Sequence, residues 1–129
     1  MIKSVTVGGV TYNVAQAPAI DQKKLLLLVG AKIAINSAAG QVDKISTQML
    51  MGALMSMSDQ TLDEVAGIVL QQCVVNGSTD KVDIHGFQGS MLNYFLLISE
   101  AIMINLSDFF AWLDNANADA RSSQKAATS

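Results

Sequence analysis

Three residues between positions 80 and 85 have side chains of the kinds that bind metal ions. Asp83 and His85 alternate with Val82 and Ile84, and Asp80 lies just before them; a strand there would bring two carboxylates and an imidazole together. A functional metal site normally needs a fourth protein ligand or a defined open position, and the sequence contains a single histidine. We therefore interpret this segment as the solvated polar edge of a loop, and we expect no metal and no cofactor.

Cys73 is the other side chain with the chemistry of a catalytic group. A nucleophilic thiol works beside a base, and this chain has one Cys and one His. The residues around Cys73 repeat at helical spacing, which places the thiol on the apolar face of a predicted helix, where its role is structural. The sequence also lacks a phosphate-binding loop with its lysine, a dinucleotide-binding fingerprint and a His-Glu-x-x-His motif. We expect that the protein is not an enzyme.

The composition predicts a protein with exposed apolar surface. The chain has 129 residues, of which 50% are hydrophobic and 15% are charged, whereas an average globular domain has about 25% charged residues. A helical chain of this length exposes much of its area, so its mean hydropathy of +0.34 implies apolar surface outside the core of a monomer. We expect a partner protein or further copies of the chain to cover that surface, and hence a homo-oligomer.

Charge and hydropathy argue against nucleic acids and membranes as partners. The net charge is −3 and the basic residues are scattered, whereas binding to phosphate backbones needs clustered Lys and Arg. Two segments, 25–39 and 91–106, are markedly apolar. The first contains Lys32 and the second contains Glu100 and Asn105, and neither reaches the roughly 18 uninterrupted apolar residues of a spanning helix. We therefore expect no nucleic acid and no membrane among its partners.

The elements that would form the apolar surface are mainly helical. Alternating apolar residues on both sides of Gly8 and Gly9 predict a β-hairpin over 3–14. The fold class predicted is mainly α, with this N-terminal hairpin followed by a bundle of about four helices in a single domain over 1–115. The first three helices are expected near 21–38, 43–57 and 58–76, and the fourth begins at Ser90. Residues 116–129 lack apolar periodicity and are predicted to form a disordered, flexible tail.

The course of the last helix is left open by its sequence. One apolar stripe runs from Met91 to Leu113 if the helix is continuous. Ser107 and Asp108 are also suitable residues to cap a new helix, so the chain either runs straight or bends there. The preceding segment, 78–89, is polar and is predicted to be a loop that holds a short strand.

Two groups of side chains are candidates for contact with a partner. Met51 and Met55 belong to a run of methionines, whose flexible side chains suit adaptable contacts but also fill irregular cores. Phe109, Phe110 and Trp112 point to different sides of one helical turn, so they cannot all enter the same small core. On a straight helix Phe109 would continue the core stripe, whereas Phe110 and Trp112 would lie beside it as possible anchors.

Several short motifs resemble one protein family. They are a Val-Gly-Gly-x-x-Tyr hairpin, a Lys-Lys-Leu-Leu helix start, acidic residues that cap the middle helices, and an Asn-Leu-Ser-Asp-Phe-Phe-x-x-Leu segment that begins at Asn105. Over about residues 3–113 this pattern resembles the tail assembly chaperones of tailed bacteriophages. None of the motifs is catalytic. The resemblance adds Asn105 and Asp108 to Phe109 and Phe110 as candidate partner-binding residues.

The resemblance implies a protein of the host cell cytoplasm that is not in the mature virion. It would bind the tape measure protein and the tail tube protein, covering the tape before tube subunits polymerise around it. Two alternatives are left open by the residues themselves. One is a structural head–tail adaptor that stays in the virion, and the other is a membrane-active, holin-like protein based on the apolar segment 25–39.

Overall fold

The N-terminal part of the protein is a three-stranded antiparallel sheet. The computed structural model describes residues 2–40 and 47–115. Its strands lie in the order β1 (Ile2–Val7), β2 (Val10–Ala15) and β3 (Cys73–Val75). β1 and β2 form the predicted hairpin, which turns at Gly8 and Gly9, both with positive φ. A side chain at Gly8 would also displace the end of the Asn93 side chain, but it is the positive φ that favours glycine there.

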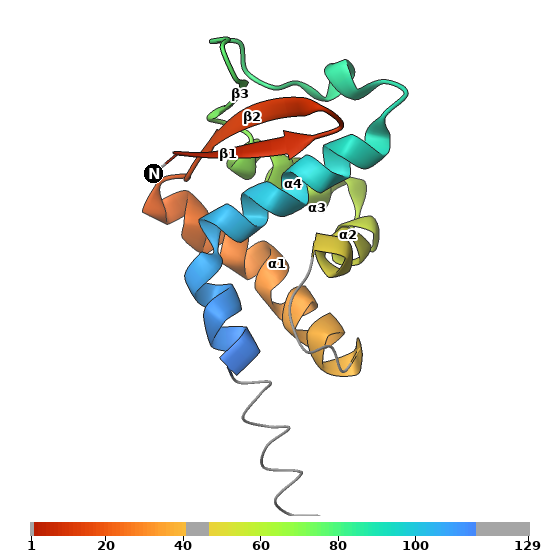
Figure 1. Ribbon diagram of the computed structural model, residues 1–129. Coiled ribbons are helices and arrows are strands. Elements are labelled where there is room, and N and C mark those ends of the chain that lie inside the picture. Colours follow the sequence, from red (N-terminus) through yellow and green to blue (C-terminus); the bar gives the residue numbers. More distant parts are fainter. Residues whose placement is uncertain (1, 41–46, 116–129) are drawn as a thin grey trace, which may run out of the picture.

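The two faces of the sheet differ as the alternation of its residues predicts. Tyr12, Val14 and Cys73 point to one face and are buried against the helices. The opposite face is polar, and there Ser4 donates a hydrogen bond of 3.1 Å to the side chain of Asn13. The sheet therefore covers the helices with one face only (Figure 1).

The helices form a second layer beneath the sheet. The described helices are α1 (Ala19–Gly40), α2 (Thr47–Met55), α3 (Asp59–Val69), α4 (Met91–Asn105) and a further helix, Ser107–Asn115. The expected number, about four, is close; the fifth arises because the last predicted helix is divided. The start of the predicted second helix, 43–46, and the predicted tail, 116–129, lie outside the described residues.

α4 is the central helix of the core. It contacts β1, α2, α3 and the short 3-10 helix η1 (Ile84–Phe87), so its side chains are covered from several directions. Figure 1 shows α4 crossing under the sheet, with α1 extending away below it. The fully covered residues of α4 are Leu97, Ile98, Ser99, Ala101 and Ile102. This burial explains why the segment 91–106 is so apolar: its side chains form the core of the protein.

The chain bends sharply where the sequence left two courses open. α4 and the helix Ser107–Asn115 meet at an angle of 80° around Leu106. The carboxylate of Asp108 accepts a hydrogen bond of 2.8 Å from the amide of Phe109 in the first turn of the new helix. After the bend, Ser107–Asn115 turns back along α1, where the ring of Phe109 lies against Gly30. The straight rod is thus excluded.

The prediction for the end of the third helix is wrong. The helix was expected to continue to residue 76, with Cys73 on its apolar face, but α3 ends at Val69. Cys73–Val75 is instead strand β3, which pairs with Tyr12–Val14 of β2. The β-branched residues Val74 and Val75 suit a strand, and β2 offers them a free edge to pair with. Tertiary pairing therefore overrides a helical pattern that continues past the end of α3.

The short strand predicted within 78–89 is also replaced. Its only ladder contact among the described residues is an isolated bridge between Val74 and Lys81. From Ile84 the chain forms η1, because the side chain of Asp83 accepts a hydrogen bond of 2.9 Å from the amide of His85 and caps the turn.

Candidate protein-binding surfaces

The residues with metal-binding side chains do not gather into a site. Asp80, Asp83 and His85 are all exposed. Within 2–40 and 47–115, no group of three or more His, Cys, Asp or Glu side chains is arranged to hold a metal ion. Asp83 has a local structural role as the cap of η1.

Cys73 is fully buried in the sheet, on the face that packs against the helices. Burial in this apolar environment raises the pKa of its thiol to about 11. Burial of the Tyr12 side chain is the main cause that raises its pKa, and the charge of the nearby Cys73 is the second. The thiol is therefore protonated at neutral pH, and it acts in the structure as a small apolar side chain.

An aromatic surface lies along the side of the last helix. The indole of Trp112 is 62% exposed, and its ring centre lies 6.0 Å from that of Phe109. Phe109 in turn lies against Gly30 of α1, and Leu27, one helical turn before Gly30, is 76% exposed. We refer to Leu27, Phe109 and Trp112 as the aromatic surface. It joins two elements that are far apart in the sequence, and no described residue covers Trp112 or Leu27.

Phe110, a sequence candidate for the same surface, lies in the core instead. Its side chain is only 6% exposed, and Leu113 is buried with it. The expectation that Phe110 lies beside the core assumed a straight helix. Because the chain bends at Leu106, the side of the new helix that carries Phe110 and Leu113 turns inward, whereas Trp112 stays outside.

The two polar candidates near the bend have different environments. Asn105 is buried, and its side chain joins the end of α4 to the start of α1 through a hydrogen bond of 2.7 Å from the amide of Ala17. Asp108 is exposed on the first turn of the last helix. Of the two, Asp108 alone offers its side chain to a partner, whereas Asn105 supports the bend that positions Trp112.

The two methionine candidates on α2 are also divided. Met51 is buried, whereas Met55 is 58% exposed near the end of the helix. The backbone carbonyl of Ser56 next to it accepts a hydrogen bond of 3.1 Å from Lys32 of α1, which holds the two helices together. Met55 is therefore an accessible apolar side chain, but the structure does not bring it into the aromatic surface.

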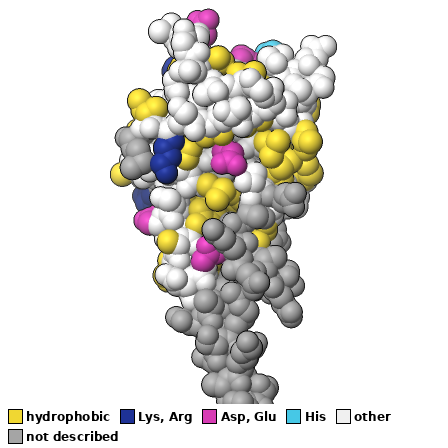
Figure 2. All heavy atoms as spheres, viewed as in Figure 1, with side chains coloured by type: hydrophobic (Ala, Val, Ile, Leu, Met, Phe, Trp, Pro, Cys, Tyr) yellow, Lys and Arg dark blue, Asp and Glu magenta, His cyan; other side chains and the backbone are white. Residues whose placement is uncertain are grey.

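The view in Figure 2 shows hydrophobic side chains on the surface in separate clusters, with few charged side chains between them. The exposed large apolar residues are Ile2, Val10, Ile20, Leu27, Met55, Val75, Ile84, Met91, Leu92 and Trp112. No single helix in the described ranges is long and apolar enough to cross a membrane, although the bent pair Met91–Asn105 and Ser107–Asn115 meets the same criteria of length and composition.

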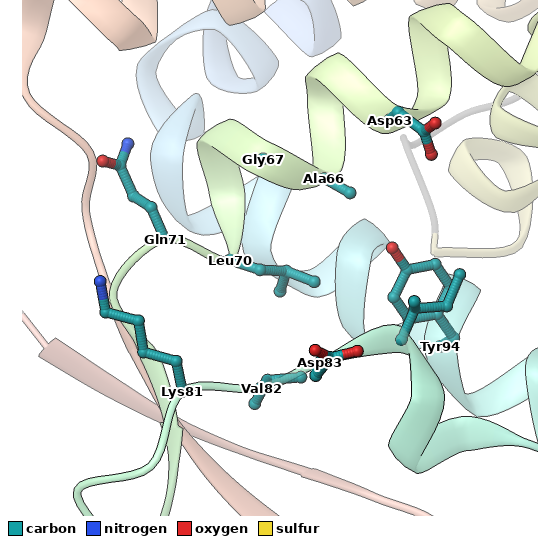
Figure 3. Close-up of a pocket in the computed structure, with 10 residues that line it drawn as sticks. Asp63, Ala66, Gly67, Leu70, Gln71, Lys81, Val82, Asp83 and Tyr94 are labelled. Atoms are coloured by element: carbon teal, nitrogen blue, oxygen red, sulfur yellow. The ribbon is translucent and has the colours of Figure 1, made fainter.

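A second candidate site is a hollow between α3 and the segment Lys81–Ile84. We refer to it as the α3 hollow; its volume is about 420 Å³, and Tyr94 of α4 lines it. Figure 3 shows the hydroxyl group of Tyr94 between Asp63, on α3, and Asp83, on the opposing segment. Burial, and then the negative charges of Asp63 and Asp83, raise the pKa of this hydroxyl.

Neither candidate site was identified as a whole from the sequence. Phe109 and Trp112 were recognised as aromatic candidates, but Leu27 was hidden in a helix that is apolar on all sides, Leu25 to Leu28. The hollow was missed. Its one sequence signal is the spacing of α3, in which Asp63, Ala66, Gly67, Leu70 and Gln71 recur at helical intervals along one side.

The described residues thus form two surfaces that suit protein contacts, the aromatic surface and the α3 hollow. The family model described as "Phage tail assembly chaperone protein, TAC" matches residues 8–118. That range begins at the turn of the hairpin and covers β2, β3, α1 to α4 and the helix Ser107–Asn115, whereas β1 lies before it. No curated protein and no solved structure matches the chain.

Proposed function

The chain belongs to the phage tail assembly chaperone family, and on this basis we propose that it binds the tape measure protein and tail tube subunits while the tail assembles. The tape is taken to be a long helical protein with apolar stripes. Such stripes aggregate unless another protein covers them, and a reversible cover needs apolar surface of its own. The chaperone supplies that cover until tube subunits replace it.

The observation that carries this proposal is the exposure of Trp112 beside Phe109. A large aromatic side chain exposed on a rigid helix is a typical binding hot spot, because it offers much apolar area at little cost in conformational entropy. The helix that carries Trp112 is held in place, because Phe110 and Leu113 of the same helix are buried in the core. An apolar stripe on a partner helix would lie across this surface.

The proposal includes self-association, because several exposed apolar clusters remain when one is occupied. We also propose that the protein acts in the host cytoplasm and is not part of the mature virion. Mass spectrometry of purified virions tests the last point, since an adaptor would be present in stoichiometric amounts and a chaperone would be absent.

Co-expression with the tape measure protein of the same phage tests the function directly. A tagged chaperone is expected to keep the tape soluble and to be isolated with it, and Trp112→Ala is expected to weaken this capture. Ile2→Ala is the matched control, because Ile2 is equally exposed but lies on β1, away from the aromatic surface. An unmodified chaperone that fails to solubilise or capture the tape contradicts the proposal.

A further inference from the structure

The α3 hollow has an unused hydrogen-bonding group at its inner end. Tyr94 is only 5% exposed, yet no hydrogen bond joins its hydroxyl to another residue in the described ranges. No buried side-chain oxygen or nitrogen there lacks a partner, so the hydroxyl must still reach solvent through the hollow that it lines. A nearly buried polar group that opens only into a hollow is available to a ligand placed there.

The charges around Tyr94 define the chemistry of that ligand. Asp63 and Asp83 line the hollow on its two sides, and neither forms an ion pair within the described chain. Asp83 accepts one hydrogen bond, from the amide of His85, which leaves its other oxygen free. The carboxylates of Asp63 and Asp83 and the hydroxyl oxygen of Tyr94 are acceptors at the same end of the hollow, and such acceptors suit a cation; Lys81, the charged lining residue of opposite sign, lies on the side away from Tyr94 (Figure 3).

The walls of the hollow are apolar, and this selects the type of cation. Ala66 and Leu70 of α3 face Val82 and Ile84 of the opposing segment. A small hydrated ion gains nothing from such walls, whereas the aliphatic stem of Lys or Arg packs well against them while its charged end reaches the carboxylates. An amphipathic, basic side chain therefore matches both the walls and the inner end.

Gly67 lines the hollow without adding a side chain to it. It lies within α3, where glycine costs about 1 kcal/mol relative to alanine. A Cβ atom at this position would meet nothing within 4 Å, so packing does not require the glycine, and its φ is not in the left-handed region. A methyl group added at Gly67 would therefore occupy open space at the wall of the hollow.

We propose that the α3 hollow binds a lysine or arginine side chain of a partner protein, with the aliphatic stem along α3 and the charged end between Asp63, Asp83 and Tyr94. The inference rests on the proposed function only for the identity of that partner, a tail protein. It adds a charged, specific contact to the apolar aromatic surface. Such a contact would favour one register of the partner, because a basic side chain gains most where its charge meets the carboxylates of the hollow.

The test uses two short peptides that differ in one side chain: an arginine flanked by leucines, and its uncharged citrulline counterpart. Binding to the full-length protein is followed by NMR. The arginine peptide is expected to bind about tenfold more tightly and to shift the signals of Gly67 and Tyr94. Asp63→Asn and Gly67→Ala are each expected to remove most of this preference.

Gly52→Ala is the matched control for Gly67→Ala. Gly52 lies within α2, and a Cβ atom there also meets nothing within 4 Å. Both variants should melt at a higher temperature than the parent protein, but only Gly67→Ala should lose the arginine preference. The proposal is overturned if the two peptides bind alike, if neither binds, or if Asp63→Asn and Gly67→Ala keep the preference.

The same variants separate this inference from the proposed function. If the tape measure protein is captured as well by Asp63→Asn and Gly67→Ala as by the parent, and the peptides show no preference, the hollow is not a basic-residue site and the chaperone function stands. If the parent does not capture the tape but still prefers the arginine peptide, the function fails and the site remains.

Discussion

The side-chain oxygen of Asn105 accepts a hydrogen bond of 2.7 Å from the backbone amide of Ala17, 88 residues earlier in the chain. The amide nitrogen of the same side chain donates to the carbonyl of Ala101 at 2.9 Å. Nearby, the side chain of Gln16 donates to the carbonyl of Ile104 at 2.9 Å. The end of α4 is thus tied to the start of α1 just before the chain bends, and the bend determines which aromatic residues reach the surface.

Replacement of Asn105 by alanine is expected to destabilise the protein by about 1 to 3 kcal/mol, because it leaves the buried amide of Ala17 without an acceptor. Urea unfolding measures this change. Asn115→Ala, at the exposed end of the last helix, is the control and should change the free energy of unfolding by less than about 0.5 kcal/mol. Equal effects of the two substitutions would show that the Asn105 contact does not support the bend.

Phe110 and Trp112 are expected to respond in opposite ways to truncation. Phe110→Ala should cost about 3 to 5 kcal/mol of stability, because it removes a buried ring from the core. Trp112→Ala should cost less than about 1 kcal/mol of stability but weaken capture of the tape measure protein by about 2 kcal/mol. Thermal melts and co-expression capture measure the two quantities. A large loss of stability with normal capture in Trp112→Ala would contradict this assignment.

Cys73 is expected to make the stability fall in alkaline solution. Burial raises the pKa of the folded thiol from 9.0 to about 11. Below pH 9 the thiol is protonated in both states, and its contribution to stability is complete. Between these values only the unfolded chain releases the proton, so the free energy of unfolding falls by up to about 1.4 kcal/mol per pH unit.

The measurement is the unfolding free energy of the parent protein and of Cys73→Ala across that pH range. The variant has no thiol to titrate, so its stability should fall less steeply. Tyr94 titrates in both proteins, and its contribution cancels in the comparison. Tyr12 loses in the variant the part of its raised pKa that comes from Cys73, and this change acts in the same direction, so the difference between the curves reports the thiol together with its effect on Tyr12. Parallel curves would mean that the thiol is not held protonated by the fold.

Leu27 is expected to contribute to self-association without contributing to the core. Leu27→Lys places a charge on a side chain that is already exposed, so the melting temperature should change little while the fraction of oligomer falls. Analytical ultracentrifugation measures that fraction. Ile2→Lys, on the outer side of β1, is the control for the added charge itself. A parent protein that is monomeric at high concentration would contradict this prediction.

The sequence by itself determined the elements whose signals are local. The hairpin could be predicted because β-branched alternation surrounds two glycines that accept positive φ. Ser58 could be recognised as a helix start because its side chain accepts a hydrogen bond from Thr61 within the same turn. The family could be recognised from short motifs, and the match over 8–118 confirms it. The protein-binding role expected from the surplus of apolar residues stays a prediction.

The tertiary structure alone decided where two segments lie, Cys73–Val75 and Ser107–Asn115. Cys73 to Val75 form a strand because the free edge of β2 lies beside them. The sequence of 58–76 contains no information about that edge, which belongs to a segment much earlier in the chain. The bend at Leu106 was decided by contacts with Ala17 and Gln16, which lie far away in the sequence. That bend places Phe110 in the core and Trp112 at the surface, because a change in the direction of a helix changes which of its sides faces the core without changing any residue in it. The local sequence shows which side chains share one side of a helix. Which side of the helix is buried depends on the other elements that pack against it.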